Sequence, residues 1–378
     1  MNKKKILVFI GGSYVSGLEI ATLHLINGLK NTGNDVRCII NGWNDGVFKQ
    51  KLDNAGIPWY EVKLGWIYFR KPLWTLDSLA HFPAAFRACK KIMRSFEPDI
   101  CHFCNYGTPI LLYPLLKGRN CLYNLQEPHE RNKKHLRIYR LLNRRVKIFT
   151  TVSRRIVKIL EDLDIPAEKT RLIYNGVPAV ETISATTITD RGIIFAIIGQ
   201  VVPWKGHDTL VDAVEQLAGS GHQFVVRIFG NDKNEYAGKL RSKIEAKGLA
   251  GYFEWKGFVK EQTDIYKQVD VVIVPSLSEE PCSLSILESM MRKKGLIVSD
   301  RGGNPELVLH NDTGLVFAAG DPAALARSMR QFLREPVLIA KMGNASGERA
   351  IENFTETRMT DEYLRVYEEM ILSHSEMS

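Results

Sequence analysis

Two glutamates, Glu280 and Glu288, stand around a short loop whose residue types could bind a sugar phosphate. An apolar run at 271–275 predicts a strand before the loop, and a helix is expected from Ser283 to Met291. Free N–H groups in the first turn of such a helix can hold phosphate, and carboxylates can accept hydrogen bonds from sugar hydroxyls. An ordinary strand–loop–helix with one capping and one surface glutamate explains this stretch equally well.

A second loop of interest, 199–206, follows the apolar strand expected at 192–199 and carries Lys205. This lysine could neutralise a phosphate, with a plain surface lysine as the alternative. Other polar or glycine-rich loops are expected after strands at 11–17, 126–130, 230–232, 280–285 and 302–306. Because parallel strands end at one edge of their sheet, we expect these loops to gather where a ligand binds.

Strand-like and helix-like segments alternate through both halves of the chain, which predicts two doubly wound parallel sheets. A stretch rich in Thr, Ser and Ala at 179–190 is the expected linker. No sequence repeat relates the two halves. We therefore predict an α/β protein of two Rossmann-like domains that face each other across a cleft.

The composition limits the class of protein. Of 378 residues, 45% are apolar and 25% are charged, which is typical of a globular chain long enough for two domains. No apolar run approaches the ~18–20 residues of a membrane span, and we interpret the short apolar run at 5–10 as a first strand, not a signal peptide. The net charge, 51 − 42 = +9, favours acidic partners, but no nucleic-acid-binding module accompanies it.

Several motifs that would indicate other chemistry are missing or incomplete. The glycine loop at 11–17 is not Gly-x-Gly-x-x-Gly, and neither a Walker motif nor Gly-x-Ser-x-Gly occurs. The pair Cys101-x-x-Cys104 lacks a second pair of zinc ligands, and all six cysteines are expected to be reduced. Asp162-Leu-Asp164 falls at a helix end, away from the expected cleft, so we reject it as a metal site.

A run of basic residues is expected to form one face of a helix that continues to about residue 147. Its members, at spacings of four, three, four and three, are Lys133, Arg137, Arg140, Arg144 and Lys147. Such a face could contact an anionic membrane or a lipid-linked phosphate, or it could simply be solvated. The aromatic stretch from Trp59 to Trp74, which also carries basic residues, could lie at a bilayer interface, stack on sugars or pack as an ordinary strand and loop.

Further motifs, taken in chain order, resemble the family-4 retaining glycosyltransferases of the GT-B fold. They are Tyr174-Asn-Gly-Val177, Gly199 with Trp204-Lys205-Gly206-His-Asp-Thr-Leu, Ser276 with Glu280-x7-Glu288, Gly302-Gly-Asn-Pro-Glu306, and Asp312-Thr-Gly314-Leu. The Gly11-Gly12 loop and the helix start at Gly17-Leu-Glu19 are similar to the first βα unit of that family. The resemblance covers nearly the whole chain and is stronger in the second half.

The resemblance implies an acceptor-binding N-terminal domain at 1–182, a nucleotide-sugar-binding C-terminal domain at 190–355, and a helix at 356–378 that crosses back to the first domain. It also implies the roles of individual residues. Lys205 would contact the donor diphosphate and Glu280 the hydroxyls of the transferred sugar, and these two are the catalytic candidates. Glu288 would take the ribose hydroxyls.

The remaining donor-side residues implied by the resemblance are Gly12, Gln200, Val259, Ser283, Leu284 and Ser285, the last two through backbone N–H groups. Gln126, Glu127 and Tyr14 would lie on the acceptor or sugar side. Three positions depart from the family pattern: Gln200 replaces an arginine, Cys282-Ser283 replaces Phe-Gly, and Gln126 replaces a histidine. Glutamine cannot act as a general base, although it can donate a hydrogen bond to the donor sugar.

The activity implied is transfer, with retention, of a sugar from a nucleotide-diphosphate sugar to a hydroxyl of a glycan or lipid-linked acceptor. A hexosyltransferase (EC 2.4) of cell-envelope polysaccharide or lipopolysaccharide synthesis is expected, without metal or cofactor, in the cytoplasm or peripherally on the inner face of the membrane. A sugar-nucleotide epimerase of similar fold and a non-catalytic binder of sugar nucleotides or anionic lipid are the alternatives.

Overall fold

The computed structural model describes residues 3–65, 72–180 and 192–375, which form two compact units. The first unit holds the chain up to Gly176 together with the stretch from Glu356 onward, and the second runs from Val177 to Thr355. The boundary falls at Gly176–Val177, before the linker expected at 179–190, because Val177 already forms a parallel bridge with Thr355. From residue 181 the expected linker lies outside the described residues.

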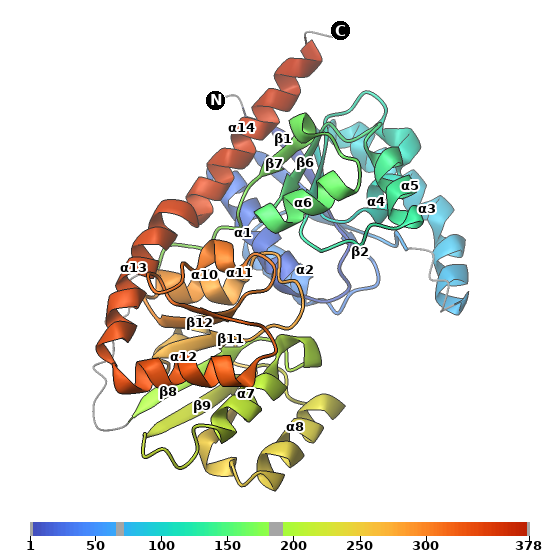
Figure 1. Ribbon diagram of the computed structural model, residues 1–378. Helices are drawn as coiled ribbons and strands as arrows, with labels where there is room; N and C mark the ends of the chain where they lie inside the picture. Colours follow the sequence, from blue (N-terminus) through green and yellow to red (C-terminus); the bar gives the residue numbers. More distant parts are fainter. Residues whose placement is uncertain (1–2, 66–71, 181–191, 376–378) are drawn as a thin grey trace. The chain divides into compact units, whose positions relative to one another are not determined.

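The first unit is built on a seven-stranded sheet in which every neighbouring pair is parallel (Figure 1). Its order is β3-β2-β1-β4-β5-β6-β7. The strands are β1 (Lys5–Ile10), β2 (Asp35–Asn41), β3 (Trp59–Val62), β4 (Ile100–Phe103), β5 (Cys121–Leu125), β6 (Ile148–Thr151) and β7 (Thr170–Leu172). The strands read as near-continuous apolar runs because helices cover both faces.

Helices divide between the two faces of this sheet. On one face, α3 (Pro72–Phe96), α5 (Lys133–Leu142) and α6 (Arg154–Asp162) share a core with the short segments α4 (Gly107–Leu111) and η1 (Tyr113–Leu116). On the other face, α1 (Gly17–Asn31), α2 (Val47–Asn54) and α14 (Glu356–Ser375) form a second core. A short 3₁₀ turn, η2 (Ala167–Lys169), precedes β7.

Helix α14 belongs to the first unit although it follows the whole second unit in the sequence. It lies beside α1, as the red and blue helices of Figure 1 show. The two helices approach closely at Gly28, where a Cβ would lie 2.0 Å from Oγ1 of Thr360. Tyr367 of α14 reaches the fully buried His102 of β4, with 2.7 Å between its hydroxyl and Nδ1 of the imidazole.

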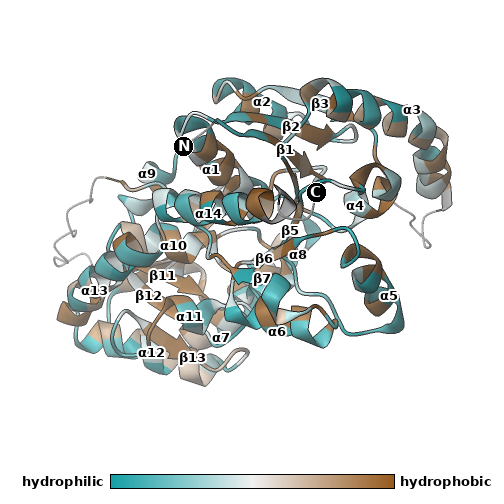
Figure 2. Ribbon diagram, turned by 90° about the horizontal axis from the view of Figure 1, so that it is seen from above, coloured by the Kyte–Doolittle hydropathy of each residue, from teal (hydrophilic) through white to brown (hydrophobic). Residues whose placement is uncertain are grey.

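The second unit is a six-stranded parallel sheet of order β10-β9-β8-β11-β12-β13. Its strands are β8 (Ile193–Ile198), β9 (Phe224–Phe229), β10 (Phe253–Gly257), β11 (Val271–Val274), β12 (Gly295–Ser299) and β13 (Leu315–Phe317). The central β11 and β12 are buried along their whole length and appear hydrophobic in Figure 2.

The helices of the second unit are α7 (His207–Glu215), α8 (Glu235–Ala246), α9 (Gln262–Tyr266), α10 (Leu284–Met291), α11 (Asn304–Leu307), α12 (Pro322–Arg334) and α13 (Val337–Asn353). Two 3₁₀ turns, η3 (Pro203–Lys205) and η4 (Ala250–Tyr252), complete it. The main core lies between the sheet and α7, α8, α12 and α13.

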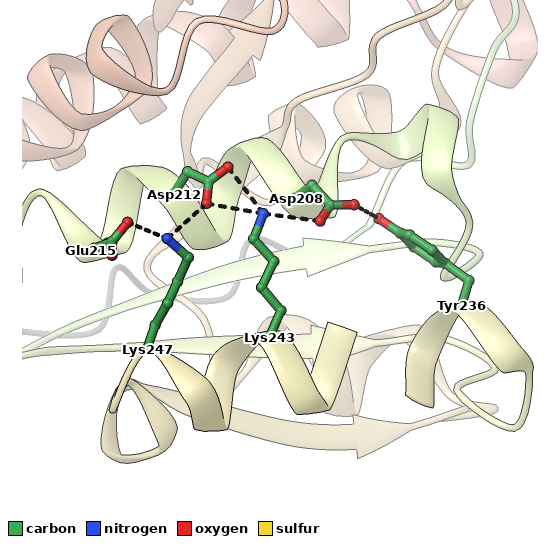
Figure 3. Close-up of polar contacts among 6 residues, drawn as sticks. All are labelled: Asp208, Asp212, Glu215, Tyr236, Lys243 and Lys247. Atoms are coloured by element: carbon green, nitrogen blue, oxygen red, sulfur yellow. Dashed lines mark hydrogen bonds and ion pairs between the residues drawn. The ribbon is translucent and has the colours of Figure 1, made fainter. Parts of the chain in front are cut away.

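A polar network joins α7 to α8 across their exposed surfaces (Figure 3). Lys243 of α8 contacts Asp208 and Asp212 of α7 at 3.0 and 2.9 Å, and the Tyr236 hydroxyl donates to Asp208 at 2.6 Å. Burial disfavours the Asp208 carboxylate, but the hydrogen bonds from Tyr236 and Lys243 outweigh it and lower the pKa of Asp208. The network fixes the first turn of α7, directly after Lys205 and Gly206.

The expected basic helix face is only partly correct. Helix α5 ends at Leu142, so Lys133, Arg137 and Arg140 lie exposed on it, whereas Arg144 and Lys147 do not belong to it. The helix stops because Val146 turns into the core and the Lys147 N–H already pairs with Cys121 O, which starts β6 beside β5. The prediction of one continuous stripe of five cations on a helix is therefore wrong.

The other sequence-based expectations concern the cysteines, the aromatic stretch and membrane-spanning helices. All six cysteines are free and buried. Of the aromatic stretch, Trp59–Val62 forms β3, and residues 66–71 lie outside the described residues. Within the described parts of the chain, no helix is both long and apolar enough to cross a bilayer.

We predict that His102 makes folding stability fall as the pH is lowered. Burial lowers the pKa of His102 to about 3, so the folded protein keeps this imidazole neutral while the unfolded chain takes up a proton near pH 6.5. The unfolded state then binds more protons, and stability is lost below pH 6.5. Between pH 7.5 and 5.5 His102 should account for about 1.4 kcal/mol of lost unfolding free energy.

Urea unfolding at both pH values measures this effect. His102→Asn should show a smaller pH-dependent loss than the parent by about 1.4 kcal/mol, whatever its absolute stability. An unchanged pH dependence in the variant would show that His102 takes up its proton in the folded state.

Candidate functional site

Two loops of the second unit meet at the C-terminal edge of its sheet, the one after β8 and the one after β11. The Leu277 N–H donates to Trp204 O at 2.8 Å, which ties the loops together. Gly206 has φ +77°, and a Cβ there would lie 1.9 Å from Pro275 O. Only glycine can combine this left-handed backbone with so close an approach, so Gly206 allows the loops to meet.

Lys205 and Glu280, the predicted catalytic pair, come together at this junction. The Lys205 Nζ lies 2.5 Å from Glu280 Oε1, and the Ser276 hydroxyl donates to Oε2 of the same carboxylate. Only 16% of the lysine side chain and 10% of the glutamate side chain are exposed. Their attraction is therefore stronger than that of a surface pair. The ammonium also lies 4.4 Å from the centre of the Trp204 ring, in a cation–π contact.

The backbone of Glu280 is held from the opposite side by the loop after β12. The Gly303 N–H donates to Glu280 O at 2.8 Å. Gly302 has φ +59°, and a Cβ there would lie 2.2 Å from the same carbonyl oxygen. The Gly302-Gly303 pair is thus explained by the close approach of two backbones, which positions the carboxylate.

Helix α10 begins beside Glu280. Ser283 is its N-cap, so the helix starts one residue later than expected, at Leu284. The Ser283 side chain does not cap the first-turn N–H groups; its hydroxyl instead lies 3.0 Å from that of Ser285. Uncapped N–H groups at the positive end of a helix favour an anion.

Glu288 lies further along α10 in a buried polar network that the sequence did not reveal. Gln262 Nε2 donates to Oε1 at 2.5 Å, and the Tyr266 hydroxyl donates to Oε2 at 3.1 Å. Arg292 stacks on the Tyr266 ring at 4.5 Å and donates to Glu288 O at 3.1 Å. Burial raises the pKa of Glu288, against the opposing effect of Arg292 and the two side-chain hydrogen bonds.

The other donor-side candidates of the second unit follow its strands at the same edge. Gln200 is exposed directly after β8, and Val259 is half-buried between β10 and α9. Gly230, after β9, has φ +152°, and a Cβ there would lie 1.8 Å from Gly199 O. The backbone of Gly199, directly before Gln200, is therefore in close contact with the backbone of Gly230, and only glycine at position 230 permits this.

In the first unit, the glycine loop after β1 is shaped by Glu19 of α1. The Glu19 carboxylate accepts from both the N–H and the hydroxyl of Ser16, at 2.9 and 2.5 Å, which forms a capping box. A Cβ on Gly12 would lie 2.0 Å from Glu19 Oε1. Gly12 thus leaves room for a buried carboxylate. Tyr14 stands 64% exposed on the same loop.

Gln126 and Glu127 follow β5 at the same edge of the first sheet. Gln126 is half-buried. Glu127 is exposed at its surface, but the surrounding protein and the like charge of Glu19 raise its pKa. The sequence indicated Glu19 only as part of a helix start. The structure places it toward the predicted acceptor side.

An aromatic cluster on the loop after β5 was also not predicted. His129 Nδ1 lies 2.7 Å from the Tyr139 hydroxyl, and its ring stacks on His135 at 5.1 Å and meets Tyr106 edge-on at 5.0 Å. Burial, with the nearby charges of His135 and Lys134, lowers the pKa of His129 to about 4. Since these side chains come from three separate segments, no local spacing could indicate the cluster.

Across the ranges that the structure describes, no group of three or more His, Cys, Asp or Glu side chains is placed to hold a metal ion.

Solved structures show that the fold is shared. A glycosyltransferase of Rickettsia africae superposes with a TM-score of 0.84 at 20% identity, covering 98% of this chain and 99% of that one. Anabaena HepE in complex with UDP superposes with a TM-score of 0.82 at 20% identity, covering 97% and 100%. The fold of both units is therefore that of GT-B glycosyltransferases, as predicted.

Curated relatives match part of the chain. The lipopolysaccharide core biosynthesis mannosyltransferase LpcC of Rhizobium leguminosarum is 27% identical over 196 residues, which is 51% of this chain and 55% of that protein. The lipopolysaccharide core biosynthesis glycosyltransferase LpsE of Rhizobium meliloti is 26% identical over 191 residues, 50% and 54% of the two chains. This chain thus matches about half the length of these relatives.

Two family models match consecutive parts of the sequence. The model described as Glycosyltransferase Family 4 matches residues 15–180, and the model described as Glycosyl transferases group 1 matches residues 181–350. Together they account for the first unit from α1 to β7 and for nearly all of the second, whereas α14 lies beyond both matches. With the resemblance and the fold in agreement, the chain belongs to glycosyltransferase family 4.

Proposed function

We propose that this protein transfers a sugar, with retention of configuration, from a nucleotide-diphosphate sugar to a hydroxyl of a glycan or lipid-linked acceptor. The observation that carries the proposal is the Lys205–Glu280 pair beside the uncapped start of α10. One cation, one carboxylate and free N–H groups are what a sugar diphosphate needs.

The donor is proposed to bind the second unit. Its diphosphate contacts Lys205 and the N–H groups of Leu284 and Ser285, while Glu288 accepts hydrogen bonds from the ribose. The structural neighbour HepE was solved with UDP and with UDP-glucose, which supports a nucleotide sugar as ligand. Gln200, Ser283 and Val259 complete the proposed donor site, and Gly12 is the donor-side candidate of the first unit.

The proposed mechanism uses the ion pair as a preformed but exchangeable contact. Phosphate oxygens would take over the Lys205 ammonium and leave Glu280 free to accept from hydroxyls of the sugar. The bond from the anomeric carbon to the diphosphate oxygen breaks as the acceptor oxygen bonds to the same face of that carbon. The acceptor proton passes to an oxygen of the departing diphosphate.

Stabilisation of the leaving group is then the main task of the protein. Lys205 and the start of α10 supply positive charge where negative charge develops, and we propose a metal-independent reaction on this basis. A protein base is not needed, which agrees with glutamine at position 126.

We further propose an acceptor of the cell envelope, held by the first unit through Gln126, Glu127 and Tyr14. The relatives LpcC and LpsE, and the structural neighbour WaaB, an outer core galactosyltransferase, all bear lipopolysaccharide names. Lys133, Arg137 and Arg140, exposed on α5, are proposed to contact an anionic membrane.

Lys205→Ala should lower kcat/KM with a working donor by about 10²–10³-fold, because one positive group aimed at the leaving diphosphate is lost. Glu280→Gln, which keeps the shape of the side chain and removes its charge, should also lower turnover strongly. Release of nucleotide in the presence of an acceptor panel measures both. Lys133→Gln, on the surface of α5, is the matched control and should retain turnover on a soluble acceptor.

Near-normal turnover in either site variant would overturn these assignments. Nucleotide release that is complete without any acceptor would instead indicate an epimerase. Donor binding without transfer to any acceptor would indicate a binding protein.

Glu288 should recognise the ribose of the donor. Among UDP, GDP and ADP, a selective nucleotide at 100 times its Kd should raise the unfolding free energy by about 2.7 kcal/mol. The parent should bind the 2′-deoxy form of that nucleotide about tenfold more weakly, as expected for one hydrogen bond to a charged acceptor. Glu288→Gln should bind both forms with nearly equal affinity. If the variant keeps the tenfold preference, Glu288 does not contact the ribose.

A further inference from the structure

A groove of about 390 Å³ opens in the first unit, away from the loops of that unit described above. Its lining residues come from four places: the segment before β5, the segment after α5, the segment before β7, and helix α14. Its basic members are Arg119, Arg144, Arg145, Lys147 and Lys169. Two of them, Arg144 and Lys147, were predicted from the sequence to contact an anionic surface from a helix face, but α5 ends before both.

Topology places these cations at the N-terminal edge of the sheet. Arg119 precedes β5, Lys147 precedes β6 and Lys169 precedes β7, and all three strands are parallel. Gln126 and Glu127 follow the other end of β5. The groove is therefore at the edge of the sheet opposite the proposed acceptor side.

Carboxylates compensate the positive charge of the groove only in part. Its only acidic lining residue is Glu369, which pairs with Arg171 outside the groove. In the described part of the chain, none of the five basic groups lies within 4.0 Å of a carboxylate. A cleft lined by one sign of charge attracts ions of the other sign.

The two lysines are engaged with backbone, which holds them in place. Lys169 Nζ donates to the carbonyl and side-chain oxygens of Asn143 at 2.8 and 2.9 Å, and Lys147 Nζ donates to Met370 O at 3.1 Å. Burial lowers the pKa of both lysines, and for Lys169 this effect outweighs the nearby Glu168 carboxylate, which raises it.

Among the described residues, the three arginines keep most of their side-chain donors free. Arg119 donates there from Nε alone, to Leu115 O at 3.1 Å. Arg145 stacks on the Tyr113 ring at 4.6 Å, and its Nε is buried without an acceptor. Arg144 is exposed, and its side chain has no hydrogen-bond partner among the described residues. Guanidinium groups bind phosphate oxygens in pairs of parallel hydrogen bonds.

We propose that this groove binds a phosphate-bearing anion, at a site separate from the donor and acceptor sites. Two or three arginine forks would hold the phosphate oxygens, and the two lysines would add charge from fixed positions. The same chemistry is offered by a free phosphate or pyrophosphate and by the headgroup of an anionic phospholipid.

Calorimetric titration with inorganic pyrophosphate tests the site. Because Lys205 should also bind pyrophosphate, the parent is compared with Lys205→Ala and with Arg144→Gln/Arg145→Gln. The pyrophosphate binding that survives in Lys205→Ala is assigned to the groove. In Arg144→Gln/Arg145→Gln, the affinity of this groove component should fall about tenfold or more. Lys133→Gln/Arg137→Gln, which removes equal charge from α5, should leave that component unchanged.

Sedimentation with vesicles separates the two sources of phosphate. If the ligand is a headgroup, the double groove variant should bind phosphatidylglycerol vesicles less than the parent does, and pyrophosphate should displace the parent from them. If the ligand is a free anion, the double groove variant should bind vesicles as the parent does, while pyrophosphate still distinguishes the two in calorimetry.

Equal binding of both pyrophosphate and vesicles by the parent and the double groove variant would overturn the proposal. Arg144→Gln alone, at an exposed side chain without internal partners, serves as a second variant if the double substitution impairs folding. It should show a smaller loss of pyrophosphate affinity in the same direction.

Discussion

The buried ion pair between Lys205 and Glu280 is the contact on which the second unit depends most. Removing charges from water is costly, so such a pair persists only where its geometry is fixed and its remaining oxygens are hydrogen-bonded. Ser276 supplies that hydrogen bond, and Gly206 and Gly302 let three loops approach closely enough to fix the geometry. Glycine is therefore needed at these positions for the geometry of the ion pair as much as for the turns themselves.

Much of this arrangement could be predicted from the sequence because it depends on local order. Three segments follow one another directly: the apolar run at 271–275, the loop after it and the helix at Leu284–Met291. The order of the motifs also predicted that Lys205 lies at the same edge of the sheet. The partners of Glu288 could not be predicted in this way. Gln262 and Tyr266 lie on a short helix of five residues, and only the packing of α9 against α10 brings them to the carboxylate.

The end of α5 shows a different limit. Basic residues continue at helical spacing beyond Leu142, and no proline or glycine marks a break. What ends the helix is the burial of Val146 and the pairing of β6 with β5, which are tertiary effects. The same turn carries Arg144 and Arg145 to the beginning of the strands. The first sheet thus has acidic groups, Glu19 and Glu127, where strands β1 and β5 end, and cations where β5, β6 and β7 begin.

Helix α14 has a consequence for the order in which the chain can fold. The second unit is an insertion between Gly176 and Glu356 of the first, so the two parts of the first unit are separated by the whole of the second. During synthesis, the apolar face of α1 and the imidazole of His102 lack their α14 partners until α14 is made, after the whole second unit. The second unit is contiguous and can form its core from consecutive residues, whereas the first remains an open sheet with exposed apolar surface until α14 docks.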